Sequence, residues 1–353
     1  MLRQRHQRTA PLHAVPLAIC VGVTVVGLVV LMLVAVGIGS VSVPLGDTWR
    51  IVISHLTGRE PGGDLVFDQI VWDFRVPRVL LAALCGAGLA VAGVLLQALV
   101  DNPLAEPYVL GLVPGASVGA VVVITVGAGA VGGVSVSFAA FAGAMIAGGL
   151  VFALGQQQGR LAPTRLVLSG VAVGYVFLAV TSYLQLKASP SDLRRVMFWL
   201  LGSVAGAQWD QLGLVAAVIL VSTCALLLTG RRLNAMVTGD ETATALGVDV
   251  RKLRIGLLTV AALLTGTVSG VAGGVSFVGL LIPHVVRLAF GVDHRRVLPL
   301  SALVGAGYLV LVDLLSRTVD SPNELPIGIF TAAFGAPFLL WLMRRNKSVA
   351  AGP

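Results

Sequence analysis

Ionisable side chains are scarce in the apolar parts of this 353-residue chain, and Asp313 is the main exception. Arg317 follows it by four residues, which places the acid and the cation on the same face of a helix. An acid within an apolar helix is costly and is often kept for proton transfer, whereas a cation one turn away favours a structural ion pair. The spacing predicts an ion pair or an interfacial polar patch at Asp313, with a proton relay as the alternative.

Two arrangements that often carry covalent chemistry are missing from the sequence. It contains no HExxH and no pair of acids in the middle of an apolar segment. Cys20, Cys85 and Cys224 lie in or beside apolar runs without CxxC spacing or a nearby histidine, so we interpret them as small apolar side chains. No GxxxxGK[ST] loop is present to bind the phosphates of ATP. We expect no catalytic residue, no metal site and no cofactor bound by this chain.

The composition indicates a membrane protein. Hydrophobic residues make up 57% of the sequence and charged residues 11%, against about 45–50% and about 25% in soluble domains. The net charge of +8 could indicate a nucleic-acid partner, but the basic residues fall in short clusters between apolar runs. The sequence therefore predicts an all-α polytopic protein of the cell membrane, with the lipid bilayer around it and no nucleic acid as a partner.

Ten apolar segments are long enough, or nearly long enough, to span a bilayer, which takes about 20 residues. They lie at 17–39, 79–100, 108–126, 133–154, 166–186, 212–229, 255–275, 276–290, 297–315 and 325–343. The seventh and eighth run together, so their boundary rests on the Gly-Gly-Val-Ser of 273–276. A further apolar stretch at 196–206 is too short to span and is interpreted as interfacial. We expect about ten transmembrane helices and no soluble domain.

The distribution of basic residues predicts that both termini are cytoplasmic. Arg3, Arg5 and Arg8 precede an apolar run that is too long for a signal peptide, so residues 1–16 are expected to form a cytoplasmic tail before a retained first span. With ten spans, the inner loops hold about twice as many Lys and Arg residues as the outer ones, in agreement with the positive-inside rule. Residues 1–353 are therefore expected to form a single transmembrane domain.

Glycine recurs at every fourth position in two of the spans, at residues 111, 115 and 119 and at residues 266, 270 and 274. Such stripes of small residues let helix backbones approach closely. We expect them to pack helices tightly within one subunit. The alternative is that some of them line a path or a contact between subunits.

The longest inner loop, residues 231–254, contains the pattern of a short helix. Asp240 and Glu241 stand where its first turn would be, and Gly247 stands where it would end, as the preferences of helix ends require. On composition alone, a plain cytoplasmic loop is the simpler interpretation. A docking surface for a separate subunit is the alternative.

Longer motifs, in the right order along nearly the whole chain, resemble the iron-siderophore and cobalamin family of ABC importer permeases. They are RVPR at 75–78, GAGLAVAGVLLQALVDNPLAEPYVLGLVPGASVG at 86–119, GDETATALG at 239–247, SFVGLLIPHVVRL at 276–288, DHRRVLP at 293–299 and ELPIGIFTAAFGAPFLLWLM at 324–343. The resemblance implies a permease domain of the cobalamin-importer type that pairs with a second copy or a paralogous permease. It also implies two ATPase subunits, which hold ATP and Mg, and an extracytoplasmic binding protein that delivers a metal chelate.

The resemblance further implies roles for particular residues. In this family the short helices of the long inner loop dock into the ATPase, so 231–254 becomes the ATPase-coupling loop. Its coupling residues would be Gly239, Asp240, Glu241, Ala245, Leu246 and Gly247. Outer arginines of the family receive acidic residues of the binding protein, and the matching positions are Arg75, Arg78 and Arg317. The alternative for each arginine is a side chain that extends along the membrane interface.

The segment DNPLAEPYVLG at 101–111 breaks two apolar runs with two prolines and two acids. By the resemblance, this turn and the turn after the fourth span meet their counterparts in the second permease to form a cytoplasmic gate. The matching gate residues are Asn102, Leu104, Pro163 and Thr164. Pro163 differs from the small polar residue that the family usually has there.

His284 and Arg287 lie about one turn apart near the inner end of the eighth span, where we expect helix-end packing in preference to ligand contact.

Taken together, the sequence predicts the membrane-spanning subunit of an ATP-driven importer, itself not an enzyme, for ferric siderophores. Haem or cobalamin import is the alternative within the same mechanism. A stand-alone proton-coupled carrier is the alternative outside it.

Overall fold

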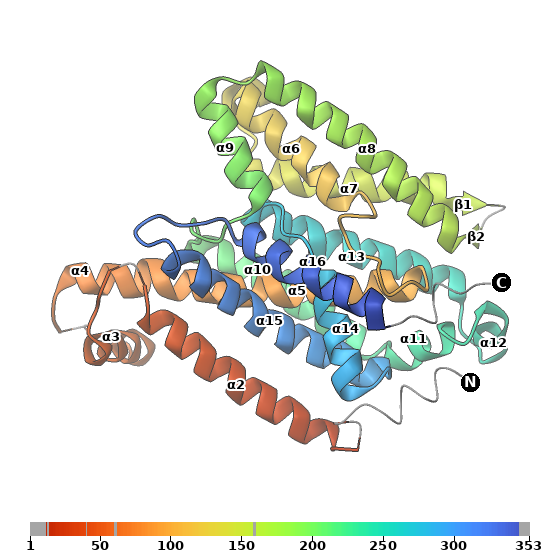
Figure 1. The fold of residues 1–353 in the computed structure, drawn as a ribbon, viewed down its shortest axis with the longest axis horizontal. Coiled ribbons are helices and arrows are strands. Elements are labelled where there is room, and N and C mark those ends of the chain that lie inside the picture. The colour runs from red at the N-terminus through yellow and green to blue at the C-terminus, as the bar shows by residue number, and fades with distance from the viewer. Residues whose placement is uncertain (1–11, 13, 40, 60–61, 158–159, 346–353) are drawn as a thin grey trace.

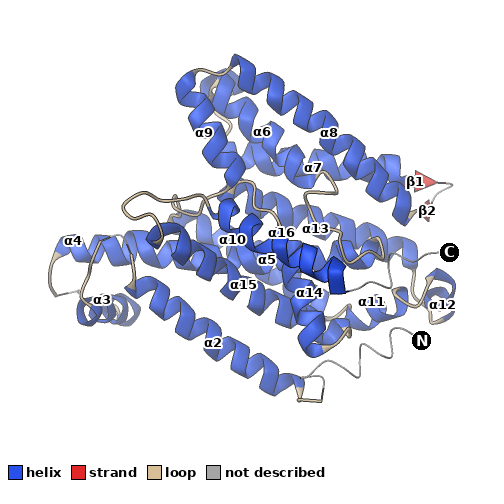
Figure 2. Cartoon of the chain, viewed as in Figure 1, coloured by secondary structure: helices blue, strands red, loops and turns tan. Residues whose placement is uncertain are grey.

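The structure, a computed structural model, describes residues 12, 14–39, 41–59, 62–157 and 160–345 and is almost wholly helical (Figures 1 and 2). The expected cytoplasmic tail, 1–16, lies mostly outside the described residues. The apolar helices are α2 (Leu17–Gly37), α5 (Val76–Leu99), α6 (Leu112–Val126), α7 (Val136–Gly155), α8 (Pro163–Lys187), α10 (Trp209–Leu227), α13 (Val250–Ala272), α14 (Val278–Phe290), α15 (His294–Thr318) and α16 (Ile327–Arg345). The connecting elements are α3 (Leu45–Thr57), α4 (Leu65–Asp68), the π-helix η1 (Gln69–Arg75), the 3-10 helix η2 (Ala128–Val131), the paired strands β1 (Gln156–Gln157) and β2 (Arg160–Leu161), α9 (Pro190–Leu201), α11 (Gly230–Met236) and α12 (Asp240–Ala245).

The expected ten spans are present as helices. Among the described residues, seven helices are long and apolar enough to cross a membrane, and one of them runs without interruption over Leu65–Leu99. Three shorter apolar helices, α6, α14 and α16, occupy the other predicted positions. The all-α multi-span fold is therefore confirmed, with boundaries that differ from the predicted ones by a few residues.

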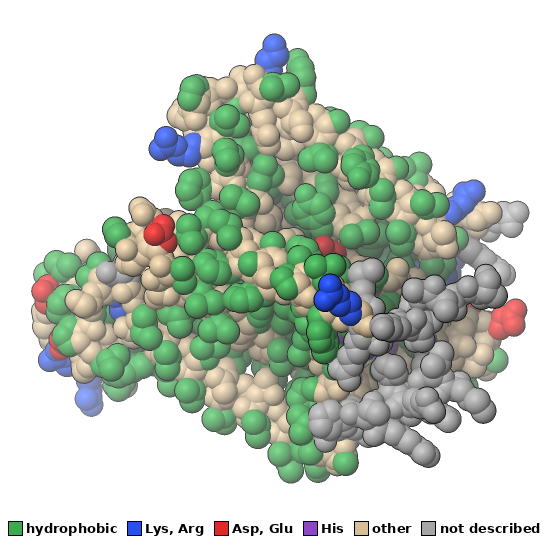
Figure 3. Space-filling model, in the orientation of Figure 1, with side chains coloured by type: hydrophobic (Ala, Val, Ile, Leu, Met, Phe, Trp, Pro, Cys, Tyr) green, Lys and Arg blue, Asp and Glu red, His purple; other side chains and the backbone are tan. Residues whose placement is uncertain are grey.

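Successive helices run back and forth along one long axis, which is horizontal in Figure 1. We call the end that carries α3 and α4 the outer end, and the end that carries α11, α12 and the β1–β2 hairpin the inner end. α2 begins and α16 ends at the inner end, as an even number of spans requires. On the face shown in Figure 3, apolar side chains are spread over the surface between the two ends and charged side chains are few, as expected for contact with lipid.

Helix α5 is the centre of the bundle and is buried along almost its whole length. Two of its glycines permit this position. A Cβ atom on Gly86 would lie 2.1 Å from the carbonyl oxygen of Gly305 in α15, and one on Gly93 would lie 1.9 Å from that of Gly279 in α14. α14 and α15 therefore pack directly against the backbone of α5.

The two predicted glycine stripes pack within the chain, mainly on α7. Gly115 and Gly119 of α6 meet one side of α7, and a Cβ atom on Gly119 would lie 2.0 Å from the carbonyl oxygen of Ala139. Gly266 and Gly270 of α13 also face α7. The remaining two stripe glycines, at 111 and 274, face α8 and α9. This confirms the expectation of tight packing within one subunit.

The predicted boundary at 273–276 is a sharp break between α13 and α14. Gly273 and Phe277 both have positive φ angles, +73° and +66°. Gly273 is also crowded, because a Cβ atom there would lie 2.3 Å from the carbonyl oxygen of Trp199. Both the backbone angle and the close approach therefore call for glycine at 273.

The apolar stretch predicted as interfacial at 196–206 belongs to α9 and the loop after it. The helix begins earlier than predicted, at Pro190, where the side chain of Ser189 accepts a hydrogen bond from the backbone N–H of Asp192. The chain leaves the helix at Gly202, whose carbonyl accepts a hydrogen bond of 3.1 Å from the backbone of Ile327. α9 has 12 residues, too few to span a bilayer. The hydrogen bond at Gly202 holds the start of α16 at the outer end.

Candidate functional site

The outer end of α2 presents backbone carbonyl groups that have no helical partner, and two arginines occupy that place. The last carbonyls of a helix carry partial negative charge and need donors from outside the helix. Arg317 donates through Nη2 to the carbonyl of Ala35 at 2.7 Å, and Arg75 donates through Nη1 to those of Val36 and Gly37 at 3.2 and 3.3 Å. α2 thus brings together cations from α15 and η1.

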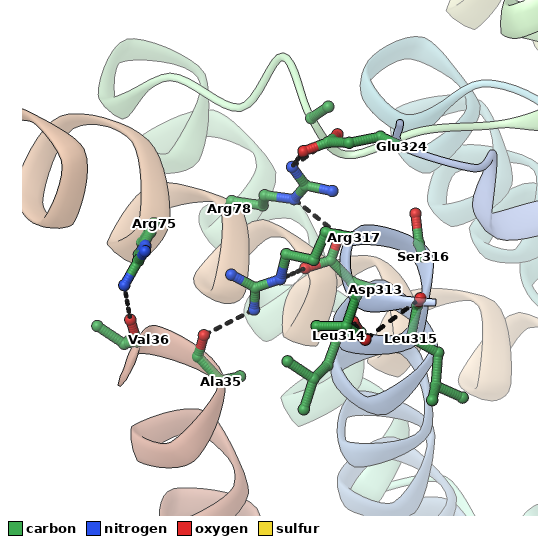
Figure 4. A network of polar contacts seen from close by, with 12 residues as sticks. Ala35, Val36, Arg75, Arg78, Asp313, Leu314, Leu315, Ser316, Arg317 and Glu324 are labelled. Carbon is green, nitrogen blue, oxygen red and sulfur yellow. Dashed lines mark hydrogen bonds and ion pairs between the residues drawn. The ribbon is translucent and has the colours of Figure 1, made fainter. Parts of the chain in front are cut away.

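Two carboxylates complete this network, which Figure 4 shows. Fully buried Asp313 accepts a hydrogen bond of 2.8 Å from Nε of Arg78 and lies 3.4 Å from Nε of Arg317. Nη1 of Arg78 donates to both carboxylate oxygens of Glu324, at 2.8 and 3.0 Å. The ion pair predicted between Asp313 and Arg317 is confirmed. Arg78, its second cation, and Glu324 were not predicted as partners of this pair.

The three arginines predicted to receive a binding protein lie together but are buried. Their exposed fractions are 5% for Arg75, 9% for Arg78 and 3% for Arg317. This disagrees with the alternative of side chains that extend along the membrane interface, because their donors are engaged inside the chain. The docking role stays a prediction.

The arginines border a cavity of about 360 Å³ that opens at the outer end. Its lining consists of Gly39, Val41, Ile70, Phe74, Arg75, Arg78, Ala205, Arg317 and Glu324. Three guanidinium groups face two carboxylates here, so the cluster carries an excess of positive charge. Guanidinium groups bind carboxylates through paired N–H donors. The chemistry available at this place is therefore recognition of an anionic group.

At the inner end, α12 has the boundaries predicted from its glycines. Gly239 precedes the helix with a φ of +110° and Gly247 follows it with a φ of +80°. Glu241 and Ala245 are exposed, and Leu246 is 67% exposed. α12 therefore offers an acidic and an apolar side chain to a partner on the inner side.

One arginine fixes α12 to the rest of the chain. Arg254 of α13 donates through Nη2 to Asp240 at 2.9 Å and through Nη1 to the carbonyl of Leu161 in β2 at 2.7 Å. Ala243, on the side of α12 that faces the rest of the chain, is buried. Asp240, predicted as a coupling residue, thus also holds α12 in place and links it to the hairpin after the fourth span.

The predicted gate residues lie at the inner end, two of them in the turn after α5 and two in the first residues of α8. The side chain of Asn102 accepts a hydrogen bond of 2.9 Å from the backbone N–H of Leu104, and both residues are exposed. The second turn is the β1–β2 hairpin, after which Pro163 begins α8 and Thr164 is exposed. Proline suits the first position of a helix, because its missing N–H would have no helical partner there.

Buried polar groups that were not predicted lie behind the first gate turn. The carboxylate of Glu106 accepts a hydrogen bond of 3.0 Å from the backbone N–H of Phe277, at the start of α14. Burial raises the pKa of Glu106 to about 7, against the opposing effect of that hydrogen bond. Gln97 donates to the carbonyl of Gly279 at 3.0 Å and accepts a hydrogen bond from Arg287. Glu106 therefore fastens the turn to α14, and Gln97 fastens the end of α5 to the same helix.

His284 and Arg287 take part in packing contacts, as expected. The ring of His284 meets that of Phe338 edge-on, with centroids 5.9 Å apart. Within the described ranges, no group of three or more His, Cys, Asp or Glu side chains is placed to hold a metal ion.

Comparison with known proteins gives one family, and the relatives are named for several kinds of cargo. The sequence matches the FecCD transport family over residues 27–345. It is 43% identical over 278 residues to a cobalamin import system permease protein of Halobacterium salinarum, covering 79% of this chain and 74% of that protein. It is 34% identical over 333 residues to an iron(3+)-hydroxamate import system permease protein of Bacillus subtilis, covering 93% and 97%. A solved inward-facing transporter, described as of metal-chelate type, superposes with a TM-score of 0.79 at 30% identity, covering 92% of this chain and 99% of that one.

Proposed function

Because the chain belongs to the FecCD transport family, we propose that it is the membrane subunit through which a ferric siderophore enters the cell. It is a multi-pass cell-membrane protein and a permease of an ABC importer of the kind that carries metal chelates. The observation that supports iron first is the similarity to the hydroxamate permease, which extends over 97% of that protein. The cargo is the substrate of the transporter and is not a resident cofactor of this chain.

Energy for transport comes, in this proposal, from ATP and Mg held by two separate ATPase subunits. The chain has no phosphate-binding loop of its own. α12 supports docking of such a subunit, because Glu241 and Leu246 are exposed while Arg254 and Ala243 fix the helix from behind. Because Arg254 of α13 bonds Asp240 of α12, a movement of the docked ATPase can be transmitted through α12 to α13.

Asp313 gives little support to the alternative of a proton-coupled carrier. A relay acid must exchange its proton with a path through the membrane. Asp313 instead lies between the guanidinium groups of Arg78 and Arg317 and is fully buried at the outer end of α15. Its geometry is that of an acid that organises two cations.

At the outer end, the cavity beside Arg75, Arg78 and Arg317 would receive carboxylates of the binding protein. Excess positive charge in a concave site attracts an acidic partner and orients it, even where each ion pair adds little affinity. At the inner end, Asn102 and Leu104, with Pro163 and Thr164, would meet their counterparts in a second permease, either a copy of this chain or a paralogue.

Cobalamin is the second candidate cargo, because the identity to the Halobacterium cobalamin permease is higher, at 43%. Haem import is a third possibility within the same mechanism. None of these changes the roles proposed for the outer arginines or for α12.

Reconstitution tests the proposal. The chain, its ATPase and a candidate extracytoplasmic binding protein from the same organism are placed in proteoliposomes. The cognate binding protein is defined as the one that stimulates ATP hydrolysis. We expect uptake of a ⁵⁵Fe-labelled hydroxamate siderophore that requires ATP hydrolysis and persists when an uncoupler removes the proton gradient.

Parallel samples with labelled cobalamin and haem distinguish the cargoes, and an ATPase variant unable to hydrolyse ATP is the control. Uptake of cobalamin alone would replace the iron proposal with the second candidate. Uptake that continues without ATP and stops with the uncoupler would contradict the importer mechanism.

A further inference from the structure

Glu324 differs from the other charged members of the outer network in its surroundings. Arg78, Asp313 and Arg317 lie on long helices and are buried, whereas Glu324 belongs to the loop between α15 and α16 and its side chain is 38% exposed. In Figure 4 it approaches Arg78 from the side opposite to Asp313. The side chain of Glu324 can therefore move away from Arg78 without any change in the packing of the helices.

The loop around Glu324 has a fixed base. The backbone N–H of Leu325 donates to the carbonyl of Ser316 at 3.0 Å, and the hydroxyl of Ser316 donates to the carbonyl of Leu325. Two residues further on, Ile327 donates to Gly202 at 3.1 Å. Because these contacts hold the backbone, rotation of the Glu324 side chain alone can open or close its pair with Arg78.

The charges explain why this pair is present. Without Glu324, Asp313 would be the single carboxylate for both Arg78 and Arg317. Removing one partner of a buried ion pair is costly, because it leaves an uncompensated charge. Glu324 supplies the missing negative charge at the edge of the cavity. A glutamate or aspartate of a docked protein would present the same chemical group to the same Nη1 atom.

We propose that Glu324 is an internal substitute for a carboxylate of the binding protein, and that docking exchanges the Glu324–Arg78 pair for an intermolecular one. This inference rests on the proposed function, which supplies the binding protein as the occupant of the cavity. After the exchange, Nη1 of Arg78 is again paired with a carboxylate, as it was with Glu324 before docking. It also weakens docking, because only the fraction of molecules with Glu324 displaced is ready to bind. Weak docking allows the binding protein to leave after each delivery.

Substitution of Glu324 tests this exchange in the assembled transporter. Glu324→Gln removes the competing charge from an exposed loop and leaves Asp313 in place. We expect the dissociation constant for the cognate binding protein to fall by roughly three- to tenfold, mainly through faster association, as expected from a partly exposed ion pair. Glu324→Asp keeps the charge but shortens its reach, so its dissociation constant should lie between those of the glutamine variant and the natural chain. Binding is measured by interferometry on transporter in nanodiscs.

Asp320→Asn is the matched control. Asp320 lies in the same loop, is exposed, and its side chain forms no ion pair among the described residues, so its removal changes the net charge equally. It should change affinity by less than about twofold. Co-purification of the ATPase with every variant checks assembly.

Unchanged or weaker binding by Glu324→Gln, relative to Asp320→Asn, overturns the inference. In that case the natural chain still binds, and the proposed function stands. If no binding protein docks on the natural chain, that result contradicts the proposed function. It then also contradicts the exchange of carboxylates.

Discussion

Glu106 is buried together with Ala105 and Pro107, in a turn whose earlier residues are exposed, and its carboxylate holds the start of α14. The cost of burying this charge raises the pKa of Glu106 from its ordinary value of 4.5 to about 7. The folded chain therefore keeps the proton at pH values where the unfolded chain has released it. Its contribution to stability is present below about pH 4.5 and is lost as the pH rises to about 7.

Replacement of Glu106 by Gln should remove this dependence. The amide oxygen can still accept the hydrogen bond from Phe277 but carries no charge. We expect Glu106→Gln to be more stable relative to the natural chain at pH 8 than at pH 4.5, by up to about 3 kcal/mol. Thermal unfolding in detergent at both pH values measures the difference. A gap between variant and natural chain that does not change with pH would contradict the assignment.

The outer network shows what residue spacing can and cannot reveal. The pair of Asp313 and Arg317 was predictable, because four residues separate them on one helix. Arg78 is 235 residues from Asp313, and no periodicity connects them. The burial of Arg75 and Arg317 was equally hidden, because both bond free carbonyls at the end of α2, which lie 39 and 282 residues away in the sequence.

At the scale of elements, α12 is the feature through which an external subunit could act. We expect the double substitution Glu241→Arg and Leu246→Arg to abolish co-purification of the ATPase and ATP-dependent uptake. Both side chains are exposed, so the substitutions should leave folding and membrane insertion intact. Affinity purification from membranes, with the amount of inserted chain as reference, measures the loss.

Lys252→Glu is the matched control for α12. It also reverses a charge in the 231–254 loop, but on α13, where Lys252 pairs with Asp249 at the exposed surface. Its effect on co-purification should be small. Retention of the ATPase by the double variant, or its equal loss from both, would reject α12 as the coupling element.

The ends of the helices were easier to predict from the sequence than their tertiary contacts. Gly239, Gly247 and the 273–276 break were recognised because a helix end depends on local backbone angles that glycine permits. The start of α9 was missed, since an apolar pattern marks which face is buried and not where a cap such as Ser189 lies. The link from Arg254 to α12 and β2 is a tertiary contact, which local patterns do not contain.

At the scale of the whole molecule, a single helical stretch connects the two candidate sites. Leu65–Leu99 continues through η1 into α5 and spans roughly 50 Å at 1.5 Å per residue. Its outer part carries Arg75 and Arg78, and its inner end leads directly into the turn with Asn102. η1 is a π-helical segment, a form that is frequent at functional sites. We therefore expect movement of the outer end to reach the predicted inner gate through this continuous helical stretch, whose α5 part is buried.

That connection predicts that the gap between the two copies of Leu104 changes with the nucleotide state. Leu104 is exposed at the inner end, where a second permease would meet it. A disulfide requires Cβ atoms about 3.5–4.5 Å apart, so it forms only when the gate is closed. Leu104→Cys should be made in a Cys224→Ser background, because Cys224 is exposed whereas Cys20 and Cys85 are buried.

We expect the yield of cross-linked dimer to differ several-fold between nucleotide-free transporter and transporter trapped with ATP, as measured on non-reducing gels. Tyr108→Cys, which is exposed on the same turn beyond the predicted gate residues, should give little cross-link in either state. Equal yields in both states would mean that the turn does not move with the ATPase. Cross-linking of Tyr108→Cys in preference to Leu104→Cys would place the contact elsewhere on the turn. If Leu104→Cys cross-links only to a differently sized partner, the second permease is a paralogue, and the gate is asymmetric.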